Sequence, residues 1–152
     1  MKFILLVILT IAMSASASAQ TNERLRGIKA FELVIEDLPE AAKTCGIDRK
    51  ALETSGRFVL GQSRVRIDPK AQAYLYILLN VVTLPSRDIC IYYLQVSARG
   101  AAMALENNAF VMGELWTSGS VGSASRRDLP RDTVMYLEQY LKEFVVAWSK
   151  VN

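Results

Sequence analysis

The sequence predicts an α+β fold: an antiparallel-rich sheet of four to five strands with two helices packed on one face, in the order β-α-β-β-β-β-α. Three observations lead to this expectation. Several apolar segments alternate with period two and are separated by short turns. Two other segments repeat apolar residues every three or four positions, as amphipathic helices do. The length of 152 residues, 51% of them hydrophobic, fits one domain rather than a disordered chain.

The first residues have the pattern of a secretory signal peptide. Lys2 supplies a positive charge, residues 3–13 form an apolar run, and the small-residue stretch SASASAQ follows. Cleavage after Ala19 would leave Gln20 at the new N-terminus. The alternatives are an uncleaved N-terminal anchor or a buried core helix. We therefore expect residues 1–19 to be a signal peptide and residues 20–152 to form a single α+β domain, exported to the periplasm or secreted.

The first half of this domain should hold a strand and a helix. Apolar residues recur with an approximate period of two in residues 27–35, which predicts a strand. Pro39 lies beyond the end of this strand. Asp48 is a good helix N-cap because its carboxylate can accept free backbone N–H groups. The helix should run over residues 49–60, with Gly61 as the residue that follows its C-terminus.

The second half should consist of strands and a final helix. The expected strands are residues 64–68, 72–84, 89–99 and 109–117, of which 72–84 is apolar on both faces and therefore central. Residues 118–127 are rich in glycine and serine and read as a loop. Asp128 can cap a helix over residues 129–150, whose apolar stripe would pack on the sheet. In this arrangement, either the sheet is curled or its second face is exposed as an apolar interaction surface.

The two cysteines, Cys45 and Cys90, are expected to form a disulfide, because an oxidising compartment pairs the thiols of an exported chain. Free buried thiols and an intermolecular bridge are the alternatives. Redox catalysis usually needs thiols close together, as in C-x-x-C, and this spacing lacks that feature.

Residues spread along the chain resemble a set of small exported proteins of Gram-negative bacteria to which no activity is assigned. They are Gly27-Ile28, Cys45-Gly46-Ile47, Tyr74-Leu75-Tyr76, Cys90, Leu115-Trp116, Gly119, Gly122 and the ending Phe144-Val145, Trp148 and Asn152. The resemblance implies export to the periplasm, the disulfide and one α+β domain. It implies no catalytic chemistry.

Composition excludes several kinds of function. The sequence has no histidine, which removes Ser-His-Asp and Cys-His catalysis and His-ligated zinc. Two cysteines cannot build a four-thiolate metal site. The net charge of +3 is too weak to indicate a nucleic-acid partner. We expect no cofactor, no metal and no transmembrane span after the signal peptide.

Four arginines are candidate anion- or partner-binding residues. Arg126 and Arg127 follow the glycine- and serine-rich segment, where backbone N–H groups and guanidinium groups could hold phosphate or carboxylate. The alternative is a surface connector. Arg64 and Arg66 share one face of a strand and could touch anionic envelope surfaces. More often such charges protect an edge strand from aggregation.

Carboxylates and aromatic residues are weaker candidates. Glu36 and Asp37 are adjacent on a strand and so face opposite sides, while Glu114 shares its parity with Phe110, Met112 and Trp116. Catalysis by such carboxylates would need a convergent pair. A further set of aromatic residues could line a groove or simply pack in the sheet: Tyr74, Tyr76, Tyr92, Tyr93 and Trp116.

The sequence favours a non-enzymatic, disulfide-bonded protein that binds a protein partner in the cell envelope or outside the cell, through a sheet face or edge. A small-ligand binder with an apolar pocket between the sheet and the C-terminal helix is the alternative. A histidine-free hydrolase that uses carboxylates is a third possibility. The oligomeric state is left open.

Overall fold

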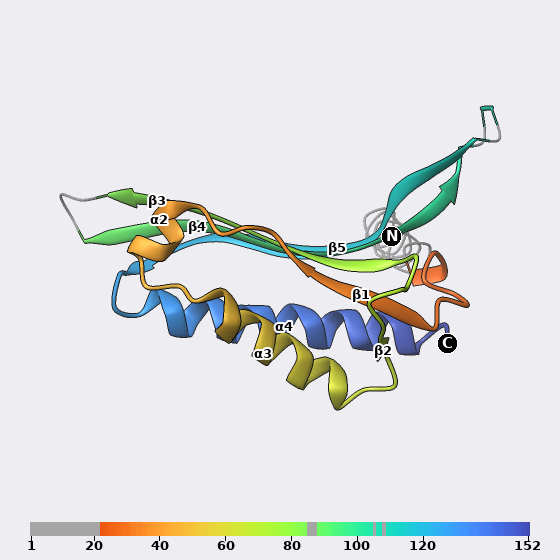
Figure 1. Ribbon diagram of the computed structural model, residues 1–152, viewed down its shortest axis with the longest axis horizontal. Helices are drawn as coiled ribbons and strands as arrows, with labels where there is room; N and C mark the ends of the chain where they lie inside the picture. The colour runs from red at the N-terminus through yellow and green to blue at the C-terminus, as the bar shows by residue number, and fades with distance from the viewer. Residues whose placement is uncertain (1–21, 85–87, 105, 108) are drawn as a thin grey trace, which may run out of the picture.

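The computed structural model describes residues 22–84, 88–104, 106–107 and 109–152. The expected signal peptide and its cleavage between Ala19 and Gln20 lie outside these residues. The described chain forms two layers, a long twisted sheet and a layer of helices beneath it (Figure 1). The α+β prediction is confirmed, including the packing of the helices on one face.

Five strands form the sheet in the order β2-β1-β3-β4-β5. Strand β1 pairs in parallel with β2 and β3, whereas the β3–β4 and β4–β5 pairs are antiparallel. The strands and helices are β1 (Ala30–Ile35), α2 (Glu40–Thr44), α3 (Arg49–Gly61), β2 (Arg66–Ile67), β3 (Tyr74–Leu84), β4 (Ile89–Met103), β5 (Phe110–Ser125) and α4 (Leu129–Ser149).

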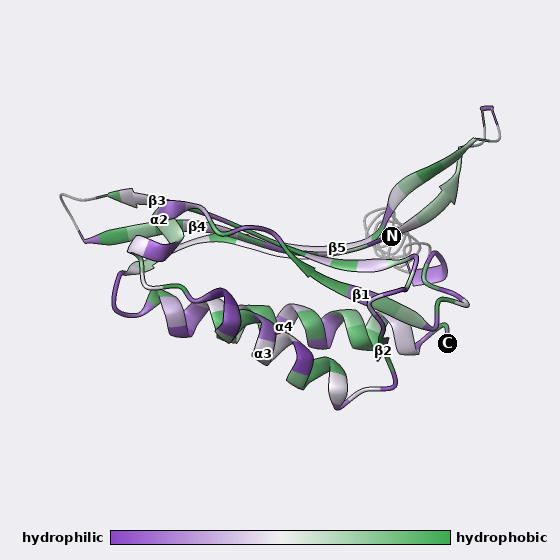
Figure 2. Cartoon of the chain, in the orientation of Figure 1, coloured by the Kyte–Doolittle hydropathy of each residue, from purple (hydrophilic) through white to green (hydrophobic). Residues whose placement is uncertain are grey.

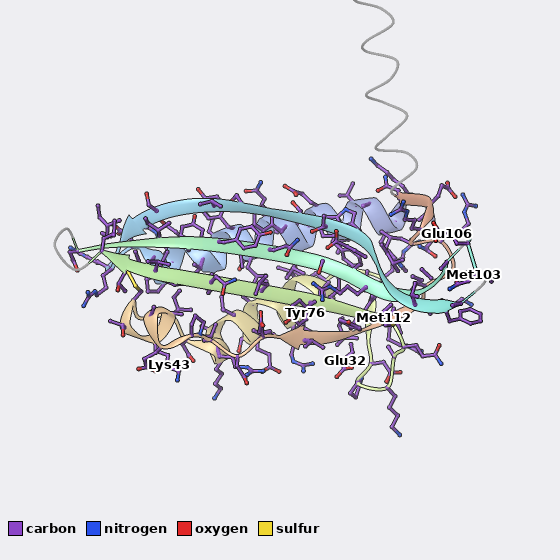
Figure 3. The ribbon with its side chains drawn as sticks, turned by 90° about the horizontal axis from the view of Figure 1, so that it is seen from above. Glu32, Lys43, Tyr76, Met103, Glu106 and Met112 are labelled. Carbon is purple, nitrogen blue, oxygen red and sulfur yellow. A yellow bond between two sulfur atoms is a disulfide. The ribbon has the colours of Figure 1, made fainter. Side chains whose placement is uncertain are left out.

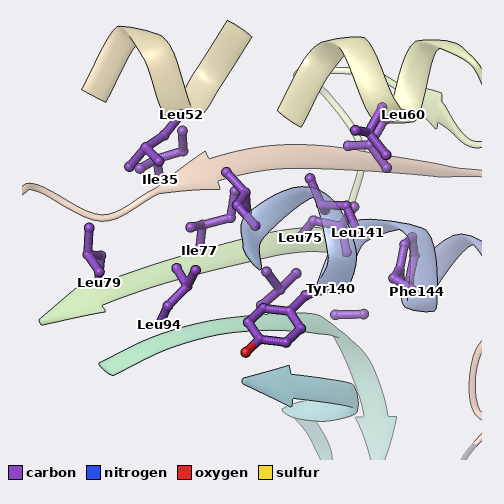
Figure 4. Close-up of a cluster of buried hydrophobic side chains, with 14 of the residues drawn as sticks. Ile35, Leu52, Leu60, Leu75, Ile77, Leu79, Leu94, Tyr140, Leu141 and Phe144 are labelled. Atoms are coloured by element: carbon purple, nitrogen blue, oxygen red, sulfur yellow. The ribbon is translucent and has the colours of Figure 1, made fainter. Parts of the chain in front are cut away.

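The hydrophobic core lies between the sheet and helices α3 and α4 (Figure 4). Alternate residues of the central strands point into it, and the apolar stripe predicted for the last helix faces them. Phe144 of α4 packs edge-on against Phe31 and Trp116, with ring centroids 5.2 and 5.4 Å away. The green apolar stretches of the helices alternate with purple polar ones (Figure 2), as expected for helices with one buried face.

Helix α3 begins as predicted and ends slightly differently. The Asp48 carboxylate accepts a hydrogen bond from the Lys50 backbone N–H at 3.0 Å, which confirms the N-cap. Gly61 is the last residue of the helix, and Gln62 follows it in a right-handed helical conformation. The prediction that Gly61 follows the C-terminus of this helix is therefore wrong. The short helix α2, which starts after Pro39, was not predicted.

The prediction of a loop over residues 118–127 is wrong for its first eight residues, because β5 continues to Ser125 and pairs with β4 throughout. Glycine and serine favour loops in isolation, but here the partner strand decides. A Cβ at Gly119 would lie 2.5 Å from the carbonyl oxygen of Leu94, so only glycine fits at that point. Strand β4 is also longer than expected, and the two strands form a long hairpin.

The disulfide predicted between Cys45 and Cys90 is present and joins the end of α2 to the start of β4. Both residues are buried, with 0% and 1% of their surface exposed. The alternative of free buried thiols is therefore wrong. The bond attaches the connection between β1 and α3 to the sheet at a sequence separation of 45 residues.

Candidate functional site

One face of the sheet is not covered by any helix that the structure describes, because α3 and α4 both lie on the other side (Figure 1). We call this surface the open face. Figure 3 looks onto it, with the strands in front of the helices. The cross-strand pairs on this face differ in polarity between the two ends of the strands. One end is apolar, with Val82 opposite Ile91, and the other end is polar and aromatic, with Tyr76 opposite Ser97 and Tyr74 opposite Arg99.

A β-bulge bends the β4–β5 hairpin at one end of this face. Ala98 pairs with Trp116 and Arg99 pairs with Glu114, so Leu115 is an extra residue without an opposite partner. Leu115 and Trp116 are consecutive and both are buried. A bulge of this kind bends a strand and changes the direction of its side chains. It separates Glu114, which is exposed, from Trp116, so the shared parity inferred from sequence does not place them on one face.

Beyond the bulge the hairpin projects from the body of the protein and rises on the side opposite the helices (Figure 1). We call its strand residues 100–103 and 110–113 the hairpin arm. Three of its large apolar side chains are strongly exposed: Met103 (53%), Phe110 (78%) and Met112 (55%). Phe110 pairs with Met103, and Met112 pairs with Ala101.

These three side chains face the same way as the open face. Cross-strand partners project to the same side, and Arg99 and Ala101 are two residues apart on one strand. Met103, Phe110 and Met112 therefore continue the row begun by Arg99 and Glu114. The other side of the arm carries three small residues, Gly100, Ala102 and Gly113, together with Val111, which is 46% exposed. The larger apolar surface of the arm thus continues the aromatic end of the open face.

Arg99 and Tyr76 lie together where the arm leaves the sheet. The Arg99 guanidinium stands 4.4 Å from the centre of the Tyr76 ring, within cation–π range, and Arg99 Nε donates to Ser97 Oγ at 3.2 Å. Tyr74 packs edge-on against Tyr76 with ring centroids 6.3 Å apart. Desolvation, and then the neighbouring Glu36 carboxylate, raise the pKa of Tyr76.

The arginines selected from sequence lie away from this site. Arg64 and Arg66 lie beside and within β2, the edge strand, and Arg66 pairs with Asp68 at 3.7 Å. Arg126 follows β5 at the far end of the sheet and pairs with Asp88 at 3.3 Å. Arg127 is exposed beside it. The structure brings neither pair together with the arm.

Of the three carboxylates, Glu36 neighbours Tyr76 and Glu114 lies opposite Arg99. The Asp37 carboxylate forms an ion pair with Arg49, whose guanidinium also donates to the Ile35 carbonyl oxygen at 2.8 Å. Of the aromatic candidates, Tyr74, Tyr76 and Tyr93 lie on the open face, whereas Tyr92 and Trp116 are buried against α4. The aromatic groove inferred from sequence is therefore divided between two faces of the sheet.

An open groove of about 770 Å³ lies between β5, the edge strand opposite β2, and helix α4. Trp116 and Thr117 border it from the strand, and Met135, Glu138, Lys142 and other residues border it from the helix. This is the position where the sequence allowed a ligand pocket between the sheet and the C-terminal helix. The lining is mixed in charge, with two glutamates and two lysines, so the groove is not the apolar pocket of that hypothesis.

Sequence reasoning missed the hairpin arm as a site. The apolar residues that form this site, Met103, Phe110 and Met112, are visible in the sequence on either side of a predicted turn. Apolar residues at alternate positions ordinarily indicate a buried strand face. The exposure of these residues follows from the end of β3, whose pairing with β4 stops at Arg99, and from the bulge, neither of which is visible in the sequence.

Within the described ranges, no group of three or more acidic or cysteine side chains is placed to hold a metal ion. Among the helices that the structure describes, none is both long and apolar enough to span a membrane.

Comparison with known proteins shows a distant structural likeness. No family model matches the chain, and no curated protein matches it. The crystal structure of a putative lipoprotein from Caulobacter crescentus CB15 is similar with a TM-score of 0.42 and 13% sequence identity. The similarity covers 86% of this chain and 95% of that one.

Proposed function

We propose that this is an exported, non-enzymatic interaction protein of the cell envelope, which binds a partner protein through the hairpin arm and the adjoining end of the open face. One observation carries the proposal: Met103, Phe110 and Met112 are exposed and face the same side as the Arg99–Tyr76 pair. Folded proteins rarely expose a large apolar patch unless it binds something.

The composition of this surface favours a protein partner. Met, Phe, Tyr and Arg are enriched in interfaces, and Tyr and Arg often supply much of the binding energy. Insertion of the arm into a lipid bilayer is disfavoured. Beyond Arg99, β4 pairs with β5 alone among the described strands, so the outer edges of the arm leave backbone groups unpaired, and such edges are costly in hydrocarbon.

The disulfide supports the exported location. A disulfide is stable in the periplasm or outside the cell and is rare in the cytosol. The cleavage of residues 1–19 remains a proposal, and N-terminal sequencing of the mature protein tests it. A first residue of Gln20 would support it, and an intact Met1 would contradict it.

A capture experiment tests the interaction. Tagged mature protein is crosslinked in envelope extracts, and the double variant Phe110→Asp/Met112→Asp is compared with wild type. Because both side chains are exposed, the variant should fold, as circular dichroism can confirm. We expect a discrete partner to be recovered with wild type and reduced at least tenfold with the variant.

Phe58→Asp is the matched control, since Phe58 is also exposed (62%) but lies on α3, in the helix layer on the other side of the sheet. It should capture the partner as well as wild type does. Equal recovery with the arm variant would contradict the proposal, as would specific turnover of a glycan or ester by protein that captures no partner.

A small ligand in the groove between β5 and α4 is the second candidate function, favoured by the volume of that groove, which lies in the range of ligand sites. Native mass spectrometry of protein purified from the envelope tests this. A bound small molecule of constant mass that is lost in Val146→Asp would support it, and bare protein mass throughout would contradict it.

A further inference from the structure

We propose that two copies of this chain associate through the free edges of their β5 strands, antiparallel to each other about a twofold axis at Ser120. The two sheets would become one sheet of ten strands. The α4 helix of each copy would fill the groove of the other. This inference goes beyond the proposed function, because the interface is the free edge of β5 and both hairpin arms stay free.

The edge of β5 lacks the features that usually protect edge strands. Among the described strands β5 pairs with β4 alone, and residues 116–125 contain no proline and no charged residue. Lysine, proline, extreme shortness or a covering segment normally block such an edge. The opposite edge is protected, since β2 has two residues and carries Arg66 beside Arg64. A long, uncharged edge is suited to pair with another strand.

The groove beneath this edge fits a second α4. Its helical side carries Met135 and Val146, which are 51% and 55% exposed although both are apolar. They lie eleven residues apart, about three helical turns, on the same side of α4. The side chains of a β5 strand alone, which are mostly serine and glycine, would not fill a groove of 770 Å³. The neighbouring α4 would supply the missing apolar volume.

A single twofold axis is compatible with both the pairing of the two β5 strands and the packing of the two α4 helices. Ser120 Oγ and Tyr140 Oη are hydrogen-bonded at 2.6 Å, so these two residues lie at the same level of the molecule. An axis at Ser120 places Val121 of one copy opposite Gly119 of the other. Val121 is 71% exposed and would cover a position that has no side chain of its own. Along α4, the same axis near Tyr140 brings Met135 of each copy toward Val146 of the other.

The charges along this axis are self-complementary. The groove contains Glu138 and Glu143 against Lys142 and Lys150, a net charge of zero. Within one copy, Lys142 Nζ lies 3.8 Å from Glu138 Oε2, and Glu138 Oε1 also accepts a hydrogen bond from Ser55 Oγ of α3 at 2.8 Å. Because Glu138 and Lys142 are equally far from Tyr140, each would lie at the level of the opposite charge on the second copy. Like charges opposite each other would destabilise the pair, and this register avoids them at these positions.

The ends of the strands agree with the same register. Glu114 and Arg126 are each six residues from Ser120, so Arg126 of one copy would come near Glu114 of the other, with Arg127 beside it. The bulge at Leu115 shifts this contact by about one residue. The sequence-selected pair Arg126 and Arg127 would then be partner-binding residues, with a second copy of the chain as the partner.

A register-specific crosslink tests the proposal on the mature protein. The axis at Ser120 places Thr117 opposite Ser123 of the other copy, and both are exposed on the open face. Within one chain these positions lie six residues apart on one strand, roughly 20 Å, which is too far for a disulfide. The double variant Thr117→Cys/Ser123→Cys should therefore form a covalent dimer on mild oxidation, whereas neither single variant should.

Light scattering after size-exclusion chromatography provides a second measurement. Wild-type mature protein at tens of micromolar should have twice the monomer mass. Val146→Glu should reduce it to the monomer mass, and Val82→Glu should not, because Val82 is equally exposed (61%) but lies at the apolar end of the open face. Phe110→Asp/Met112→Asp should remain dimeric, which separates this proposal from the function of the arm. A monomeric wild type, or crosslinking of the double variant no greater than that of the single variants, would overturn the proposal.

Discussion

Gly122 of β5 lies directly opposite Tyr92 of β4, and a Cβ at Gly122 would stand 2.6 Å from the Tyr92 ring. The glycine leaves the space that the tyrosine occupies. Tyr92 is thereby buried between the sheet and α4, 6.3 Å from the ring of Tyr136. A segment whose composition resembles a loop is held as a strand because its partner strand supplies the large side chain.

Gly122→Ala should therefore lower the free energy of unfolding by about 1–3 kcal/mol, the usual cost of overpacking. In a Tyr92→Leu background the same change should cost much less, and urea unfolding of the four proteins measures the coupling. Gly61→Ala is the control. It lies at the end of helix α3 with nothing within 4 Å of a new Cβ, so it should be neutral or stabilising. Equal costs of Gly122→Ala in both backgrounds would contradict the steric explanation.

Stability should also fall at high pH because of Tyr92. Burial, followed by the neighbouring Tyr136, raises the pKa of Tyr92 from 10 to about 12. The unfolded chain loses this proton near pH 10 while the folded protein keeps it. The stabilisation is therefore complete below pH 10 and disappears as the pH rises through 12, a loss of about 3 kcal/mol.

Tyr92→Phe removes the titrating hydroxyl, so its unfolding free energy should fall less steeply between pH 10 and 12 than that of wild type. Tyr93→Phe on the open face should keep the wild-type slope. Denaturant unfolding at several pH values measures both slopes. Identical slopes in wild type and Tyr92→Phe would show that Tyr92 is not responsible.

The disulfide should contribute a large part of the stability. Closing a loop over a sequence separation of 45 residues restricts the unfolded chain, and the chain-entropy model gives about 4 kcal/mol for it. We expect Cys45→Ala/Cys90→Ala to lower the urea midpoint substantially. Reduction of the wild-type protein should produce a similar shift, while the reductant should leave the double variant unchanged. A midpoint that does not move in either experiment would refute this contribution.

The side chain of the last residue connects the two ends of the described chain. Asn152 Nδ2 donates to the carbonyl oxygen of Leu25 at 2.9 Å, and Asn152 Oδ1 accepts from the Gly27 backbone N–H at 2.7 Å. Asn152→Ala should cost about 1 kcal/mol and speed amide exchange at Gly27. Asn152→Asp keeps the acceptor and should protect that amide better than alanine does. Equal exchange in all three proteins would contradict this role.

Sequence patterns predicted the elements that local rules control. Apolar residues at alternate positions identified β3 and the buried face of β4, and the Asp48 cap identified the start of α3. The pairing of Cys45 and Cys90 followed from their number alone, given export. The arm and the full length of β5 could not be predicted, because a bulge and a partner strand determine them.

The sequence by itself determined the fold class, the disulfide and the chemistries that an absence of histidine excludes, since these depend on residue types, counts and short-range periodicity. Tertiary structure decided which apolar residues are buried and which are exposed. Phe110 and Phe144 look alike in the sequence, yet one is 78% exposed and the other fully buried. The difference arises because β3 ends its pairing at Arg99 while α4 continues beneath the sheet, and only long-range strand pairing and helix packing fix those positions.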